Sequence, residues 1–203
     1  MKRRDFVKGA GIATAAATTL AAPAIAQERI QWNMVMPWPK GAPGVGVNAE
    51  RFAQRVNEMS GGRLEIRLFA AGELVPPFES FDAVQSGTAD ILHGTPYYWV
   101  GKSKAFNYFT TVPFGLSAVE LPAWLTYGGG QELWEEAYDD FGLQPFYAGS
   151  SCVQAGGWFR REINTWEDLQ GLKIRMAGLG GEVLRRAGST VLLLPPGEIL
   201  PAM

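Results

Sequence analysis

The sequence has only one cysteine and one histidine, Cys152 and His93, among its 203 residues. A single cysteine excludes an internal disulfide, and one cysteine with one histidine cannot supply the ligand set of a zinc site. The chain also lacks a Gly-x-Ser-x-Gly sequence and a pair of acidic residues spaced for acid–base chemistry. These absences leave little from which to build an active site.

Basic residues are also few once the amino-terminal segment is set aside. Residues 1–26 hold four of the 18 Lys and Arg and one of the 20 Asp and Glu, which leaves residues 27–203 with a net charge near −5. There is no basic run in that part of the chain, and no second hydrophobic stretch long enough to span a membrane. This balance argues against nucleic acid as a partner.

The first 26 residues, "MKRRDFVKGAGIATAAATTLAAPAIA", have the composition of an export signal. A basic start, a weakly apolar middle and Ala24-Ile25-Ala26 before Gln27 match the three regions of such a signal and a small-x-small cleavage site. Arg3 and Arg4 match a twin-arginine consensus, which predicts export of the folded protein to the periplasm. The alternative is a chance basic cluster ahead of an ordinary secretion signal, which predicts the same compartment.

Strand and helix patterns alternate in the first half of the remaining chain. Alternating apolar residues predict strands within 29–39, 63–72 and 89–94, and helical patterns occupy 47–62 and 76–87 between them. Strand, helix, strand, helix, strand at this spacing predicts an α/β fold with a parallel sheet.

The second half is less regular. Residues 97–117 are aromatic-rich and irregular, and 119–142 predict a helix interrupted at Gly128-Gly129-Gly130. The patterns beyond it predict strands at 143–149, 153–160, 172–178 and 190–195, a helical turn at 165–171 and a helix at 181–188. The loose, small-residue stretch near residue 150 predicts a domain change there, with one lobe at 27–150 and the start of a second at 151–203. The chain stops as a helix begins after Pro195-Pro196-Gly197, so we expect the second lobe to be incomplete.

Arg175 lies in "GLKIRMAG", a short strand that otherwise has the pattern of a buried one, with Ile174 and Met176 on one side and Lys173 and Arg175 on the other. We expect little water there. An arginine keeps its charge under such conditions, so it needs a negative partner. One interpretation is an edge-strand arginine paired with a nearby glutamate. The other is a ligand carboxylate, for which the planar guanidinium is suited. Gln154 lies beside Ala155, Gly156 and Gly157, small residues that leave room for a ligand.

Two other kinds of site have weaker support in the sequence. Gly178-Leu179-Gly180-Gly181 after a strand is typical of a dinucleotide loop, but Val183 stands where the third glycine belongs. A glycine-rich turn before a helix binds other anions equally well. Cys152 with His93 could form a nucleophile and base, but no neighbouring residue is placed to orient the histidine.

Several stretches together carry a family resemblance. They are "GRLEIRLFAAGELVPPFESFDAVQSGTADILHGTPYYWVGK", "VPFGL", "WLTYGGGQELWEE", "VQAGGWFRREINTWEDLQGLKIRMAG" and "GEILPAM". The chain resembles the solute-binding proteins of tripartite ATP-independent periplasmic (TRAP) transporters, related to dicarboxylate-binding proteins. "YYWVGK", "YGGG" and "VQAGGWFR" are most similar to the branch that binds 2-oxo acids such as pyruvate.

The resemblance implies a two-lobed periplasmic solute-binding protein fold with parallel or mixed sheets. It implies that Arg175 binds the ligand carboxylate, that Gln154 contacts the ligand and a bound cation such as sodium, and that Tyr97 and Tyr98 form a wall of the pocket. The other metal ligands would come from a region beyond residue 203, as would the helix used for homodimers. The implied partners are a small carboxylate and the membrane permease subunits.

We therefore expect an exported, non-enzymatic protein that captures a small organic acid for uptake driven by an ion gradient. The alternatives are a protein of the same fold for a dicarboxylate, sugar acid or aromatic acid, and an exported enzyme that uses Cys152.

Overall fold

The structure is a computed structural model that describes residues 29–203. The predicted export signal lies outside the described residues. The elements follow one another in the order β1 (Ile30–Val35), α2 (Val45–Met59), β2 (Leu64–Phe69), η1 (Pro77–Glu79), α3 (Ser80–Gln85), β3 (Ile91–Leu92), η2 (Pro96–Trp99), η3 (Lys104–Phe109), α4 (Glu120–Tyr127), α5 (Gly130–Asp139), η4 (Glu167–Leu169), β4 (Lys173–Arg175), α6 (Gly178–Arg186), β5 (Thr190–Leu192) and α7 (Pro196–Ala202), where η marks a 3-10 helix.

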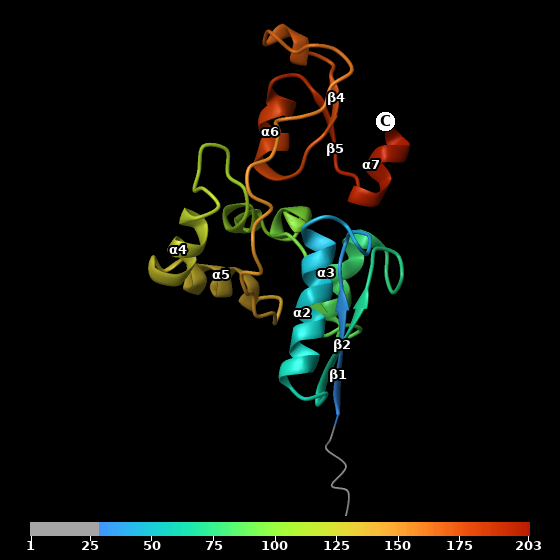
Figure 1. The fold of residues 1–203 in the computed structure, drawn as a ribbon. Helices are drawn as coiled ribbons and strands as arrows, with labels where there is room; N and C mark the ends of the chain where they lie inside the picture. Colours follow the sequence, from blue (N-terminus) through green and yellow to red (C-terminus); the bar gives the residue numbers. More distant parts are fainter. Residues whose placement is uncertain (1–28) are drawn as a thin grey trace, which may run out of the picture.

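The first sheet has three parallel strands in the order β2–β1–β3. Ile30 pairs with Leu64 at one end of β1, and Val35 pairs with both Phe69 and Leu92 at the other. Helix α2 connects β1 to β2, and α3 precedes β3, so the predicted alternation of strands and helices is confirmed (Figure 1). Parallel strands need such helical connections because the chain must return to the same end of the sheet.

Aromatic rings fill the core beside this sheet. Phe81 of α3 and Phe106 of η3 are both 0% exposed, and their ring centroids lie 5.8 Å apart. The ring centroid of Tyr138 in α5 lies 4.4 Å from that of Phe106. This cluster of rings therefore holds α5 against α3 and η3.

The predicted interruption at residues 128–130 is also confirmed, because α4 ends at Tyr127 and α5 begins at Gly130. Gly129 has φ +79°, a conformation that other residues adopt with difficulty. A Cβ on Gly130 would lie 2.7 Å from the ring of Trp124, so only glycine allows the two helices to turn this closely.

The second sheet consists of β4 and β5, which are parallel and joined by α6. Lys173 pairs with Thr190, and Arg175 pairs with Leu192. In Figure 1 the arrowheads of β1 and β2 point towards the part of the chain that holds β4, β5 and α7. The carboxyl ends of the first sheet therefore face the second sheet.

Two predicted strands are wrong. Residues 143–149 and 153–160 have no regular structure, and Phe146, Val153 and Trp158 are 75%, 98% and 87% exposed. A strand needs a neighbour for its backbone N–H and C=O groups, and no strand among residues 29–203 pairs with these segments. Within the same residues, no helix combines the length and apolar character needed to cross a bilayer.

Candidate functional site

The strand order of the first sheet points to a binding crevice. The chain passes from central β1 to β2 on one side, and later enters β3 on the other side. The loops that leave the carboxyl ends of β1 and β3 therefore diverge, and ligands of open parallel sheets bind at such a point. Trp38 follows β1 there, and Tyr97 and Tyr98 follow β3.

The two tyrosines lie in η2, a 3-10 helix that begins at Pro96. Proline is favoured at the first helical position because its fixed φ suits the turn and its missing N–H is not needed. Tyr98 is 9% exposed, and its ring lies 4.9 Å from that of the half-buried Tyr97. Burial raises the pKa of Tyr97 to about 12, so its hydroxyl stays protonated at neutral pH.

Arg175 is the last residue of β4 and contacts one of these tyrosines. Its Nε donates to the carbonyl oxygen of Leu194 at 3.0 Å, and its Nη2 donates to the hydroxyl of Tyr98 at 3.3 Å. The guanidinium carbon also lies 5.8 Å from the centroid of the Tyr98 ring. These contacts join the second sheet to the loop that follows β3.

No acidic side chain within residues 29–203 forms an ion pair with Arg175. The local arginine–glutamate pair considered from the sequence is therefore not formed in the described part of the chain. Nη1 also makes no hydrogen bond to any of these residues, so part of the guanidinium is available to an anion.

Gln154 lies apart from this cluster. It is exposed, and its Nε2 donates to Ser151 Oγ at 2.7 Å. No hydrogen bond among the described residues joins it to Arg175, Tyr97 or Tyr98.

The described residues do not form a cation site by themselves. Residues 29–203 contain no group of three or more His, Cys, Asp and Glu side chains placed to hold a metal ion. Gln154 Oε1 would supply a single oxygen, whereas hard cations such as calcium take six or more.

The cysteine and the histidine do not meet. Cys152 is exposed, with φ +58°, whereas His93 is half-buried and its Nε2 lies 3.1 Å from the carbonyl oxygen of Val45. Burial lowers the pKa of His93, which keeps the ring neutral. No hydrogen bond within the described chain joins the two residues, so the structure offers no activated thiol.

The glycine-rich turn considered as an anion loop serves a packing role. Gly178 begins α6 with φ +60°, and a Cβ there would lie 3.2 Å from Tyr97 Cβ and 3.3 Å from Asn107 Oδ1. The absence of a side chain allows the second sheet to approach the loops of the first.

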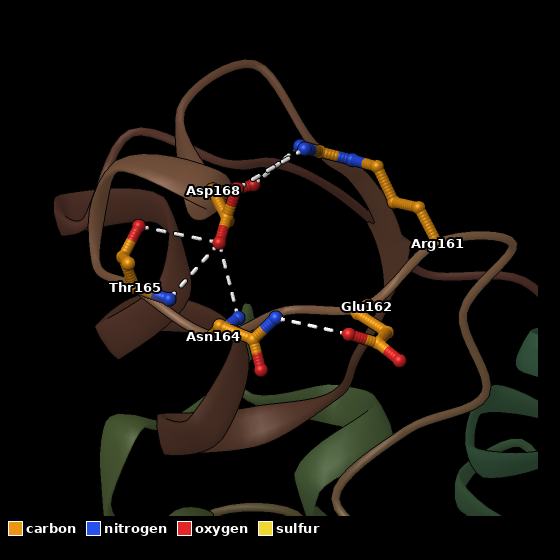
Figure 2. Close-up of polar contacts among 5 residues, drawn as sticks. All are labelled: Arg161, Glu162, Asn164, Thr165 and Asp168. Atoms are coloured by element: carbon orange, nitrogen blue, oxygen red, sulfur yellow. Dashed lines mark hydrogen bonds and ion pairs between the residues drawn. The ribbon is translucent and has the colours of Figure 1, made fainter.

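A polar network holds the loop that leads into β4 (Figure 2). Asp168 Oδ2 accepts from the backbone N–H groups of Asn164 and Thr165 at 3.0 and 2.9 Å, and Arg161 Nη2 donates to the Asp168 carbonyl oxygen at 2.7 Å. The two backbone N–H groups lower the pKa of the Asp168 carboxyl, so the network is charged at neutral pH. It fixes the approach of the chain to Arg175.

Sequence reasoning missed Trp38 and Asn107. Trp38 is 4% exposed and Asn107 8% exposed, and both Trp38 Nε1 and Asn107 Oδ1 are buried without a hydrogen-bond partner among the described residues. The sequence does indicate a role for Trp38 in one respect, because it follows the first strand, where ligands of parallel sheets bind.

Two surface hollows lie away from these residues. One is lined by residues of α2 and β2, including Gln54 and Glu65, and the other by residues 159–163. Each has a volume of about 470 Å³, but neither is lined by Arg175, Tyr97 or Tyr98.

Comparison with known proteins identifies relatives whose ligands are known. A monocarboxylate 2-oxoacid-binding periplasmic protein of Nostoc sp. is 44% identical over 210 residues, which cover 100% of this chain and 57% of the relative. A TRAP periplasmic solute-binding protein of Pseudoalteromonas atlantica, solved with sodium and pyruvate, is 44% identical with a TM-score of 0.83. A similar protein of Colwellia psychrerythraea, solved with calcium and pyruvate, is 41% identical with a TM-score of 0.82. Both alignments cover 86% of this chain and 53% of the solved one.

This chain thus spans little more than half the length of these relatives. Its α/β architecture with parallel sheets is that of the TRAP periplasmic solute-binding proteins, as the resemblance implied. The sequence profile of the bacterial extracellular solute-binding proteins of family 7, DctP, matches residues 35–203. The chain belongs to this family.

Proposed function

We propose that the chain is the periplasmic solute-binding component of a TRAP transporter and captures a small 2-oxo monocarboxylate such as pyruvate. The 2-oxoacid-binding and pyruvate-bound relatives support this choice of ligand. In this proposal the protein has no enzymatic activity, and membrane permease subunits take the ligand from it for uptake driven by an ion gradient.

The contact between Arg175 and Tyr98 is the observation that carries the proposal. A half-buried guanidinium with a free Nη1 and no acidic partner in the described chain lies between two sheets. A ligand carboxylate there would accept hydrogen bonds from the guanidinium, and shielding from water would strengthen them.

The two lobes of this proposal are residues 27–150 and 151–203. Arg175 belongs to the second lobe and Tyr98 to the first, so a carboxylate bound between them would favour the closed arrangement. Such ligand-driven closure is a common transition in periplasmic binding proteins.

A cation is a further part of the proposal, since sodium or calcium accompanies pyruvate in two solved relatives. Gln154 Oε1 is the oxygen that this chain would contribute. The described residues do not supply the rest of the ligand set, and the roles of Arg175 and Tyr98 do not depend on the ion.

The test is calorimetric titration of the chain with pyruvate. Arg175→Met keeps the length and apolar character of the side chain but removes its donors. Loss of hydrogen bonds to a charged partner is worth about 1.5–3 kcal/mol, or roughly a ten- to hundredfold loss of affinity. Arg55→Met, which replaces an exposed arginine of α2, is the matched control and should bind as the parent does.

Two results would contradict the proposal. One is an Arg175→Met variant that binds pyruvate as tightly as the parent but unfolds at a much lower temperature, because the arginine would then be structural. The other is a parent that binds a dicarboxylate or sugar acid in preference to pyruvate.

A further inference from the structure

Trp38 lies just beyond the carboxyl end of β1 and has a buried indole N–H without a hydrogen-bond partner among the described residues. Its side chain is 4% exposed. A buried donor without a partner has lost its water and gained nothing in exchange, so such groups are uncommon in folded proteins. Each such group needs an explanation, and a ligand that binds at the donor is one of them.

We propose that Trp38 is a binding residue whose indole N–H donates to the 2-oxo oxygen of the ligand. This inference rests on the proposed function, because it takes the carboxylate of the same ligand to be bound by Arg175.

The fold places Trp38 at the crevice. It lies in the loop after β1, beside the switch point between β1 and β3. Its ring is edge-on to His93 at 5.4 Å and to Tyr98 at 6.5 Å, and Tyr98 accepts the hydrogen bond from Arg175. Trp38 is therefore next to Tyr98, which contacts Arg175 of the second sheet.

The backbone holds Trp38 in a fixed position. Its carbonyl oxygen accepts from Ala71 N at 3.1 Å, and Met36 N donates to Phe69 O at 3.1 Å, so the loop after β1 is tied to the loop after β2. A donor held in place before the ligand arrives needs no ordering when the ligand binds.

Trp38 packs in the hydrophobic core of the first lobe, together with Met36 and Tyr98, and α7 lies against the residue that follows it. A Cβ on Gly197 of α7 would lie 3.5 Å from Pro39 Cγ, next to Trp38. The hydrogen bond of 3.3 Å between Arg175 and Tyr98 is long and breaks easily. Movement of the second sheet away from Tyr98 would uncover the loop that carries Trp38.

The indole chemistry specifies the ligand group. An indole N–H donates and cannot accept, so its partner must be an oxygen with a free lone pair. The 2-oxo oxygen of pyruvate meets this requirement. The 2-ammonium of alanine has no lone pair, and the hydroxyl of lactate brings a proton that needs its own acceptor. We therefore expect affinity to fall from pyruvate to lactate and further to alanine.

The experiment compares Trp38→Phe with Trp134→Phe. Both tryptophans are buried, and both indole Nε1 atoms lack a partner in the described chain. Trp134 belongs to α5 and stacks on Phe109 in the core, so its variant loses the same atoms at a place away from Arg175. Trp38→Phe should lower the affinity for pyruvate about tenfold, the effect of one buried hydrogen bond, and reduce the preference over lactate. Trp134→Phe should leave both unchanged.

A measurement on the unmutated chain keeps the inference testable if Trp38→Phe does not fold. The indole ¹H–¹⁵N resonance of Trp38 can be assigned through its contact with His93, the single histidine. Pyruvate should shift this resonance downfield, as a new hydrogen bond does, and leave that of Trp134 in place.

The outcomes separate the inference from the function on which it rests. A parent that binds pyruvate with an unmoved Trp38 resonance, or a Trp38→Phe variant of parental affinity, overturns the inference alone. A parent that binds no 2-oxo acid overturns both.

Discussion

Arg175 Nη2 donates a hydrogen bond to the hydroxyl of Tyr98, 77 residues earlier in the chain, at a distance of 3.3 Å. Arg175 ends β4 in the second sheet, and Tyr98 follows β3 of the first. The hydroxyl of Tyr98 accepts this bond and keeps its own proton for a further acceptor. One residue pair thus connects the two sheets, and both of its members carry hydrogen-bond donors.

Tyr98→Phe should weaken pyruvate binding without abolishing it. The variant removes a hydroxyl that positions the guanidinium and could donate to the ligand, while the ring that packs over Arg175 remains. The loss of one hydrogen bond, about 0.5–1.5 kcal/mol, predicts an increase in Kd of roughly two- to twelvefold. Calorimetric titration measures it, with Tyr127→Phe, a change at an exposed tyrosine, as control. Parental affinity in Tyr98→Phe would place the hydroxyl outside the site.

His93 should make stability depend on pH near 6. Burial lowers its pKa in the folded protein below the ordinary value of 6.5, so the unfolded chain takes up a proton first as pH falls. The unfolding free energy should therefore be constant above about pH 7, decrease as pH falls below 6.5, and level off below the folded pKa.

Urea denaturation at a series of pH values between 7.5 and 5 measures this dependence. His93 is the single histidine of the chain, and the lowered carboxyl pKa values, such as that of Asp168, affect a more acidic range. His93→Gln should remove the slope between pH 7 and 5.5. A slope that persists in this variant would assign it to another group.

The sequence predicts the secondary-structure elements that depend on patterns of neighbouring residues. The β1–α2–β2 pattern and the break at Gly129 follow from alternation of apolar residues, helical spacing and glycine, and the structure has each of them. Arg175 could be singled out because a charge in a short strand with the pattern of a buried one needs a partner. That the group it contacts is Tyr98 depends on how the two sheets pack, which no local pattern encodes.

The strands predicted at 143–149 and 153–160 are wrong because strand formation also depends on a partner that is distant in the sequence. Their alternation is a real strand pattern, but a strand forms only when another backbone pairs with it, and the described chain provides none. Trp38 was missed for a third reason. Only the three-dimensional structure shows that a buried indole N–H lacks a partner.

The exposed apolar side chains of residues 143–160 predict self-association. Phe146, Val153 and Trp158 present apolar surface on backbone that is free to pair with another chain. The chain should bind a hydrophobic dye and form larger species as its concentration rises. Replacement of Val153 and Trp158 by serine should reduce both dye binding and association, whereas Val119→Ser, a change at another exposed apolar side chain, should not. Sedimentation velocity distinguishes a monomer from associated species.

Arg3 and Arg4 predict the export route, although they lie outside the described residues. If the twin-arginine system reads this pair, replacement of both by lysine should leave the precursor in the cytoplasm, because lysine keeps the charge but not the guanidinium groups. Cell fractionation followed by immunoblotting measures the distribution. Normal export of the lysine variant would assign the signal to the general secretion route and leave the periplasmic location unaffected.

Gly178→Ala tests the close approach between the two sheets. Gly178 has φ +60°, where a residue with a Cβ is destabilised by about 1–2 kcal/mol. Its Cβ would also lie 3.2 Å from Tyr97 Cβ and 3.3 Å from Asn107 Oδ1, both tighter than ordinary contact. The variant should therefore unfold more easily and bind pyruvate more weakly, because the crowded methyl group pushes α6 and Arg175 away from the tyrosines.

Gly72→Ala separates these two effects. Gly72 has φ +81°, but a Cβ there would meet no atom within 4 Å, so this variant carries the backbone strain without the contact. Thermal unfolding should show a similar loss of stability in both variants, with a further loss in Gly178→Ala. Calorimetric titration should show weaker pyruvate binding in Gly178→Ala alone, since only its methyl group lies between the sheets that Arg175 and Tyr98 connect. Equal binding by the two variants would mean that the approach of α6 to Tyr97 contributes nothing to the site.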